Sequence, residues 1–239
     1  MKAVALFLGF FALYLVTAYP TVSPYRDSGD LAASAVTLGI AHPPGYPLYT
    51  LASRGWLALL RLGDPAYRLN VFSAATGAAA LAILVLALAP EGALPATAAV
   101  LILGFAPAFW KLSLVSEMYA LNALFAAVIF LALRRAGPEA RRWPLVAFLL
   151  GLGFTNHQTL LLLVPGLIFF LPHWGRCPPD VWRAVGATRI PVGATLLFLS
   201  LGLSVYLFLP IRSFQNPLLD WGEPHHLRGL WRVLTRADY

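Results

Sequence analysis

The chain has 239 residues, of which 59 % are hydrophobic and 11 % are charged. A soluble domain has about a quarter of its residues charged, so this composition excludes an ordinary soluble protein and predicts a surface that lipid covers. The net charge of +7 comes without a nucleic-acid-binding signature, so we expect no nucleic-acid partner and assign the excess arginines to cytoplasmic loops.

Apolar runs predict about seven membrane spans in one all-α domain, a polytopic transmembrane helix bundle. The first run covers residues 3–19 and has no A-x-A cleavage site, so we interpret it as a retained signal anchor with a cytoplasmic N-terminus. A first outer loop of about residues 20–70 follows, and a polar outer tail covers residues 211–239. The remaining runs cover residues 71–89, 94–110, 117–133, 144–155, 158–171 and 190–209.

Residues 47–62, in the first outer loop, are apolar but carry charges. Arg54, Arg61 and Arg68 follow one another at intervals of seven residues, so they share one helical face. A charge at the bilayer centre is costly, so we predict a helix that lies in the membrane interface rather than a span. The three arginines then lie on the outer side, where an anionic ligand would explain them.

Residues 144–171 could form one long helix or two short ones. Arginine-rich segments flank this region, with Arg134, Arg135, Arg141 and Arg142 before it and Arg176, Arg183 and Arg189 after it. Both segments can be cytoplasmic only if the chain crosses the membrane an even number of times between them. We therefore predict two short spans that meet at Thr155-Asn156-His157, where exposed backbone must line protein or a cavity.

The first outer loop contains two acids, Asp27 and Asp30, in the sequence R-D-S-G-D. Asp27 or Ser28 would cap a helix over residues 29–40, and both carboxylates would lie near the positive end of its dipole. One interpretation is a plain N-cap. The other is catalytic, because an ionised carboxylate can accept a proton from a hydroxyl group held against it.

The segment H-P-P-G-Y-P, residues 42–47, has a strongly specified backbone, because proline fixes φ and glycine permits unusual φ. Pro47 is expected to be the first residue of the interfacial helix. His42 would either contact a ligand or proton, or be a solvated residue of a structural turn. We count His42 and Tyr46 among the candidate substrate-binding residues.

Three polar residues near predicted helix ends are further candidates for substrate binding. Glu117 opens a span, and its structural alternative is an acid that favours a helix N-terminus, paired with Lys111. Asn156 and His157 lie between two short apolar helices, where a polar pair is expensive in lipid and needs a partner. Their structural alternative is a hydrogen bond that joins two helices.

Two arginines complete the candidate substrate-binding residues. Arg212 ends the last predicted span, and it would hold a phosphate in a two-pronged way, together with Arg54. The alternative is an interfacial arginine that reaches lipid head groups. The single cysteine, Cys177, excludes an internal disulfide, and no Cys/His spacing predicts a zinc site.

In order along the chain, these segments resemble the successive motifs of a known membrane protein family. The motifs cover nearly the whole chain and read D-S-G-D, G-I-A-H-P-P-G-Y-P-L-Y, Asn70, V-S-E-M-Y-A-L-N, G-L-G-F-T-N-H-Q-T, Y-L-F-L-P-I-R and D-W-G-E-P. The family was long a domain of unknown function, and its animal members are similar to O-mannosyltransferases that modify receptor ectodomains of the plexin type. The resemblance implies a GT-C glycosyltransferase fold, a polyprenyl-phosphate sugar as donor, and a general base in the first outer loop.

Carried over to this chain, the resemblance implies that Asp27 is the general base and that Asp30 lies beside it, where family members often have Glu. It suggests mannose as the sugar and a Ser or Thr hydroxyl as the acceptor. Many relatives continue beyond the T-R-x-x-Y segment, whereas this chain stops at Tyr239. We therefore expect a minimal or a truncated family member.

The resulting hypothesis is an inverting membrane glycosyltransferase whose site faces the non-cytoplasmic side, which is the periplasm or exterior for a bacterial inner membrane. Expected partners are membrane lipid, a polyprenyl-phosphate sugar, and an acceptor protein or glycan. No cofactor is expected, and a divalent metal at Asp27 and Asp30 stays open. Two alternatives also stay open: a transporter or flippase, because broken helices with polar residues occur there too, and a non-catalytic assembly subunit.

Overall fold

The computed structural model describes residues 1–24, 26–135, 143–165 and 191–237. This part of the chain is helical, and one isolated bridge pairs Ile40 with Asp220. The longer helices are α1 (Lys2–Thr17), α2 (Ser28–Thr37), α3 (Pro47–Leu59), α4 (Pro65–Leu88), α5 (Ala93–Phe105), α7 (Met118–Arg135), α8 (Trp143–Asn156), α11 (Val192–Leu203) and α13 (Leu227–Thr235). The shorter ones are η1 (Ala89–Glu91), α6 (Pro107–Leu112), η3 (Gln158–Leu162), η4 (Ser204–Leu207) and α12 (Phe208–Ser213).

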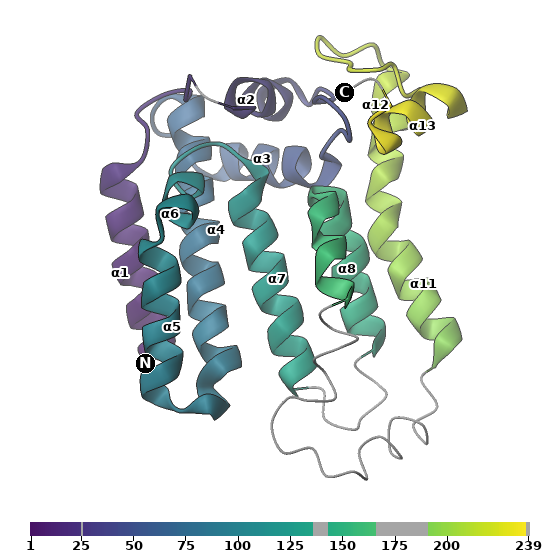
Figure 1. Ribbon diagram of the computed structural model, residues 1–239. Coiled ribbons are helices and arrows are strands. Elements are labelled where there is room, and N and C mark those ends of the chain that lie inside the picture. Colours follow the sequence, from purple (N-terminus) through teal and green to yellow (C-terminus); the bar gives the residue numbers. More distant parts are fainter. Residues whose placement is uncertain (25, 136–142, 166–190, 238–239) are drawn as a thin grey trace.

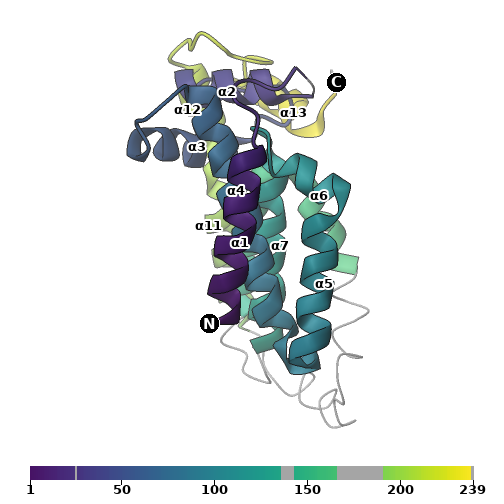
Figure 2. The same ribbon diagram turned by 90° about the vertical axis from the view of Figure 1, so that its left-hand side faces the viewer.

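The helices form a bundle with a layer across one of its ends. Helices α1, α4, α5, α7, α8 and α11 run side by side, and α2 and α3 lie across the end of this bundle (Figure 1, Figure 2). We call α2, α3, α12 and α13, which all lie at this end, the end layer, whereas the N-terminus lies at the opposite end. The segments that carry the candidate site residues therefore meet at one end of the molecule.

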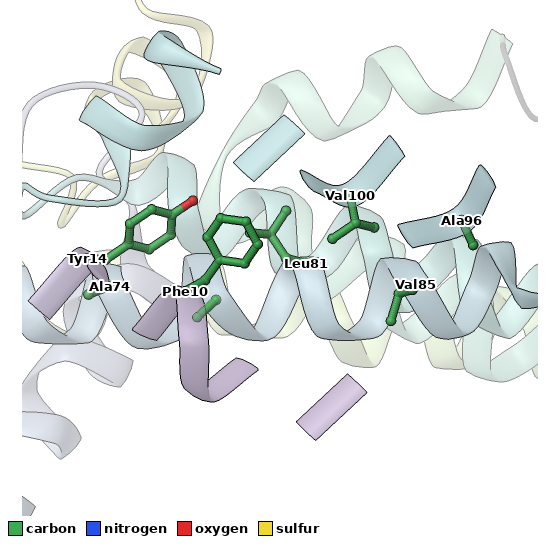
Figure 3. Packing of buried hydrophobic residues seen from close by; sticks show 8 residues of the cluster. Phe10, Tyr14, Ala74, Leu81, Val85, Ala96 and Val100 are labelled. Atoms are coloured by element: carbon green, nitrogen blue, oxygen red, sulfur yellow. The ribbon is translucent and has the colours of Figure 1, made fainter. Parts of the chain in front are cut away.

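Apolar packing between α1, α4 and α5 holds one side of the bundle together. Phe10, Tyr14, Leu81 and Val100 are buried there, with small alanines between them (Figure 3). The Tyr14 hydroxyl donates to the Gly104 carbonyl over 2.7 Å. A Cβ atom at Gly104 would lie 2.3 Å from Phe10 Cζ, so the absence of a side chain at this position lets the helices approach closely.

Two helices of the described part are long and apolar enough to cross a membrane. They cover Pro65–Glu91, with 27 residues, and Val192–Ser213, with 22 residues. Helices α1, α5, α7 and α8 are apolar as well but shorter. Together with the composition, these helices indicate a membrane protein, and the total of about seven crossings stays a prediction.

The predicted apolar runs correspond to observed helices, with one interruption. The run over residues 94–110 is broken at Ala106, which is extended, because a proline at the next position disfavours helical backbone in the residue before it. Helix α8 ends at Asn156 and η3 begins after His157, at the predicted junction. Part of the predicted second short span, residues 166–171, lies outside the described residues, as do Arg141, Arg142, Arg176, Arg183 and Arg189.

The first outer loop forms α2 and α3, and each ends slightly earlier than predicted, α3 at Leu59 rather than at residue 62. Helix α2 stops at Thr37 rather than near residue 40, because Leu38 takes the left-handed conformation and Ile40 donates its N–H to the Leu219 carbonyl over 2.7 Å. Helix α3 begins at Pro47, as predicted, and lies across the bundle end (Figure 1). Its position at a membrane surface stays a prediction.

Candidate active site

Asp27 stands at the N-cap position of α2, but its side chain does not cap the helix. Its Oδ2 atom lies 3.5 Å from His42 Nε2, and its backbone N–H donates to Glu117 Oε1 over 3.0 Å. The plain N-cap interpretation is therefore wrong for this carboxylate. The chain places Asp27 at a helix N-terminus, where the dipole favours negative charge, and leaves its side chain for other contacts.

His42 lies between the two acids of the first outer loop. Its Nδ1 atom is 2.6 Å from Asp30 Oδ2, and its backbone N–H donates to the same oxygen over 3.0 Å. The other Asp30 oxygen accepts from Trp221 Nε1 over 3.2 Å. The side chains of Asp27, Asp30 and His42 are 33 %, 23 % and 5 % exposed, so Asp27 is the most accessible of the three and Asp30 is the more fully bound acid.

The H-P-P-G-Y-P segment fixes the position of His42 and links it to α8. Gly45 and Tyr46 both have positive φ, and a Cβ atom at Gly45 would lie 2.8 Å from Leu209 Cδ2. The Tyr46 ring lies 5.0 Å from the His42 ring and stacks on the His157 ring with centroids 5.8 Å apart. The rigid loop thus brings both histidines into contact with one buried tyrosine, His42 in an edge-type arrangement and His157 in a stacked one.

Glu117 supports α2 from the start of α7, outside the membrane-spanning helices. It is 1 % exposed, and its Oε1 atom accepts from the Asp27 N–H and from the Ser28 hydroxyl, the latter over 3.2 Å. Burial, and next the nearby Asp27 carboxylate, raise the pKa of Glu117 to about 7. Among the described residues no ion pair joins Glu117 to Lys111, so that predicted pair is not formed.

Asn156 and His157 stand at the junction between α8 and η3. The Asn156 amide donates to the Met118 carbonyl over 3.1 Å, which joins α8 to the start of α7 as the structural alternative predicted. The Thr159 N–H donates to His157 Nδ1 over 3.2 Å, so the neutral ring carries its proton on Nε2. Burial, followed by the charge of Arg236 and then by His42, lowers the pKa of His157 to about 4.

Arg54 and Arg212 lie at the other end of α2 from Asp27, so the structure does not bring them beside the acids. Arg212 donates through Nε to the Leu38 carbonyl over 2.7 Å, and Arg54 donates to the Val36 carbonyl over 2.7 Å. A ten-residue helix is about 15 Å long, and this length separates the two arginines from Asp27. Both arginines bind the carbonyl end of α2, where its dipole favours cations.

Arg236 is a cation near His157 that the sequence interpretation missed. It follows α13, and the Gln158 side chain donates to the Leu234 carbonyl over 2.8 Å, which holds this helix end against the α8–η3 junction. The buried Arg236 Nε has no hydrogen-bond partner in the described part of the chain. The apolar spacing of Leu227, Leu230, Trp231 and Leu234 was the available signal for an amphipathic helix that ends beside the site.

The two acids are arranged around the His42 ring. Asp27 and Asp30 contact different ring nitrogens of His42, so their oxygens do not converge on one point. Within the described ranges no group of three or more His, Cys, Asp or Glu side chains could hold a metal ion, and Cys177 lies outside these ranges. We call Asp27, Asp30, His42 and Glu117 the acid–histidine cluster; carboxylate and imidazole groups in contact can accept and donate protons.

Comparison with known proteins gives one family. A family model described as the protein O-mannosyl-transferase TMEM260 N-terminal domain matches residues 27–90 and 90–174, more than half of the chain. The mouse protein O-mannosyl-transferase TMEM260 is 30 % identical over 250 residues, which cover 99 % of this chain and 34 % of the mouse protein. The protein of the same description from Dictyostelium discoideum is 29 % identical over 258 residues, which cover 99 % of this chain and 30 % of that protein.

The chain thus spans about a third of the length of these curated relatives. No solved structure matches it. The matched region begins at Asp27 and includes the whole acid–histidine cluster, Tyr46, Asn156 and His157, whereas Arg212 and Arg236 lie beyond it.

Proposed function

The chain belongs to the TMEM260 N-terminal domain family, and from this membership we propose that it is a membrane glycosyltransferase. It would move a sugar, mannose by analogy with the names of its relatives, from a polyprenyl-phosphate donor to an acceptor hydroxyl group. The observation that carries the proposal is the acid–histidine cluster, which joins α2, the H-P-P-G-Y-P segment and the start of α7 at one end of an apolar bundle.

Asp27 is the proposed general base. Its side chain is more exposed than those of Asp30 and His42. It also makes no capping hydrogen bond to α2. The acceptor oxygen attacks the anomeric carbon as its proton passes to Asp27, and the bond from that carbon to the phosphate oxygen breaks. The electron pair leaves with the polyprenyl phosphate, so a single displacement inverts the anomeric configuration. Because phosphate is a good leaving group, no strong general acid is needed.

Asp30 and His42 are proposed to position Asp27. Asp30 holds the imidazole through both the ring Nδ1 and the backbone N–H of His42, and the ring presents Nε2 to Asp27. Such a base–orienter arrangement fixes the direction in which the reactive carboxylate points. Glu117 fixes the backbone of Asp27 by accepting a hydrogen bond from its N–H.

Arg236 and His157 are proposed to hold the donor phosphate. A guanidinium group recognises phosphate through paired N–H donors, and the buried Nε of Arg236 has no partner among the described residues. Neutral His157 adds an Nε2–H donor close to this charge. Arg212 and Arg54 already donate to the carbonyl end of α2, whereas the charge of Arg236 acts on His157.

A transfer assay tests the proposal. The purified chain is incubated with polyprenyl-phosphate mannose and a Ser/Thr-containing acceptor peptide. Asp27→Asn should lower kcat by at least about 100-fold, the range expected for loss of a general base. Asp64→Asn is the matched control, because Asp64 truly caps α4 through the Ala66 N–H and Asn caps equally well. Wild-type turnover in Asp27→Asn would remove Asp27 from the mechanism.

The same preparation distinguishes the other functions. In the transfer assay, Arg236→Gln should raise KM for the donor while membrane insertion is unchanged. Reconstituted vesicles with a labelled donor would reveal a transporter if the label crosses the bilayer without transfer. Neither transfer nor movement would mark an assembly subunit, the outcome favoured if catalysis needs the remaining two thirds of the relatives' length. We further propose a multi-pass topology of about seven spans with the end layer on the non-cytoplasmic side.

A further inference from the structure

A cavity lies at the C-terminal end of α2, whereas Asp27 of the acid–histidine cluster stands at its N-terminus. A cavity of about 230 Å³ opens between α2, α3 and the start of α4, and it is lined by Val36, Arg54, Leu57, Ala58, Pro65 and Arg68. Two of these side chains are cationic and the others are apolar. We call this cavity the arginine pocket. Because pockets for complete drug-sized ligands span about 300–1,000 Å³, this one fits a small group rather than an entire lipid.

The charges around the arginine pocket are not neutralised by nearby acids. Arg54 donates to the Val36 carbonyl and Arg68 to the Leu57 carbonyl, both neutral groups, and Arg68 Nε is buried without a hydrogen-bond partner in the described part of the chain. Asp64, the neighbouring acid, instead accepts from the Ala66 and Tyr67 N–H groups as the cap of α4. No ion pair joins a carboxylate to either arginine across the residues described.

Apolar side chains stand beside this charge at the edge of the end layer. Leu59 and Leu62, just beyond the pocket-lining turn of α3, are 84 % and 82 % exposed. A cationic pocket next to exposed leucines matches a lipid whose phosphate is bound by arginine and whose chains lie on apolar surface. Arginine suits this role because its planar fork binds two phosphate oxygens at once.

We propose that the arginine pocket binds a phosphate group, the chemistry shared by an anionic lipid head group and a soluble phosphate. This site is separate from the donor site, because Arg54 contacts the C-terminal end of α2 whereas Asp27 stands at its N-terminus. The inference does not depend on glycosyl transfer. A lipid bound here would anchor α3 and α2 in the interface and so hold the end layer against the bundle.

Binding of defined probes to the full chain in neutral detergent tests the proposal. The probes are dioctanoyl phosphatidylglycerol, dioctanoyl phosphatidylcholine and inorganic phosphate, each titrated while bound fractions are read by native mass spectrometry. Arg54→Gln/Arg68→Gln should weaken phosphatidylglycerol binding by about tenfold or more, the loss expected when charge-assisted hydrogen bonds are removed. Arg228→Gln/Arg232→Gln, which removes two exposed arginines of α13, is the control with the same change in net charge.

Each outcome decides a separate point. Arginine-dependent binding of phosphatidylglycerol with weak binding of inorganic phosphate identifies a lipid head group, and arginine-dependent binding of inorganic phosphate alone identifies a soluble source. Equal probe binding by wild type and the double variant would overturn the site. Arg54→Gln alone, at an exposed side chain, gives the same test if Arg68→Gln prevents folding. Because transfer is not measured, failure of this proposal is distinct from failure of the proposed function.

Discussion

Burial favours the neutral forms of two titratable side chains in the candidate site, one an acid and the other a base. Burial and the Asp27 carboxylate raise the pKa of Glu117 to about 7, whereas burial and the Arg236 charge lower the pKa of His157 to about 4. Because protonation is linked to folding, the two pKa shifts change the stability of the folded state with pH in opposite directions. Glu117 makes the folded state less stable as pH rises from 4.5 to 7, and His157 makes it less stable as pH falls from 6.5 to 4.

Glu117→Gln isolates one of these contributions. Glutamine keeps an oxygen that can accept from the Asp27 N–H and the Ser28 hydroxyl, but it does not titrate. Above pH 4.5 the unfolded wild type loses a proton that its folded state retains, so the wild type should lose up to about 3 kcal/mol relative to the variant by pH 7. Thermal unfolding in detergent between pH 4 and pH 7.5 measures this difference.

The comparison has an internal control, because His157 titrates in both proteins and cancels in the difference. At pH 4 Glu117 is mostly protonated in both states of the wild type, so the Tm difference there is the baseline for the substitution itself. A Tm difference that stays constant from pH 4 to pH 7.5 would contradict the raised pKa of Glu117.

Close approach between α8 and α11 depends on two glycines that face each other. A Cβ atom at Gly202 would lie 2.5 Å from the Phe148 carbonyl oxygen, and one at Gly151 would lie 2.5 Å from the Leu199 carbonyl oxygen. Both contacts are with backbone, so no side-chain rotation can relieve them. Small residues at such a crossing let two apolar helices gain dispersion contacts that lipid would otherwise supply.

Gly202→Leu should therefore separate α8 from α11. Overpacking costs about 1–3 kcal/mol when side chains can move, and a backbone clash should cost at least that much. Gly193→Leu is the matched control on the same helix, because a Cβ atom there meets nothing within 4 Å. Thermal unfolding and size-exclusion profiles compare the two variants. Equal Tm values would show that the glycine contact does not hold the helix pair together.

Element positions were largely predictable from sequence, but some element ends were not. Apolar runs and Pro47 located the helices because both signals are local in sequence. The end of α2 depends on Leu38 in a left-handed conformation that leucine rarely adopts, and on Arg212, whose bond to the Leu38 carbonyl spans 174 positions along the chain. No local pattern could indicate that contact, so from the sequence we interpreted Arg212 as a phosphate ligand instead.

At the scale of the molecule, polar residues from five separate segments gather at one end of an apolar bundle. The parity of the arginine-rich loops predicted that these residues share a side, because every crossing between two cytoplasmic loops must be matched by a return. The same argument could not predict which of the arginines on that side lies close to the candidate site. The end of α13, which carries Arg236 close to His157, is held there by contacts such as that of Gln158 with the Leu234 carbonyl, between residues 76 positions apart in the chain.

If the bundle crosses the membrane, a reagent outside the cell should reach one of its ends and not the other. Leu218, in the outer tail, is 94 % exposed, and Leu94, at the start of α5 and near the N-terminal end of the bundle (Figure 1), is 82 % exposed. Because the chain has one cysteine, a Cys177→Ser background permits single labelling sites. A membrane-impermeant maleimide should label Leu218→Cys in intact bacterial cells and Leu94→Cys only after permeabilisation, since Lys2 and Arg134 mark the Leu94 end as cytoplasmic.

Permeabilised cells provide the control, because both positions are exposed and both should then react to the same extent. Labelling of both cysteines from outside would mean that the bundle does not separate its ends across a membrane. The acid–histidine cluster would then have no defined side from which to meet a lipid-linked donor. Labelling of Leu94→Cys alone would place the cluster in the cytoplasm, and the donor would have to carry its sugar on the inner leaflet.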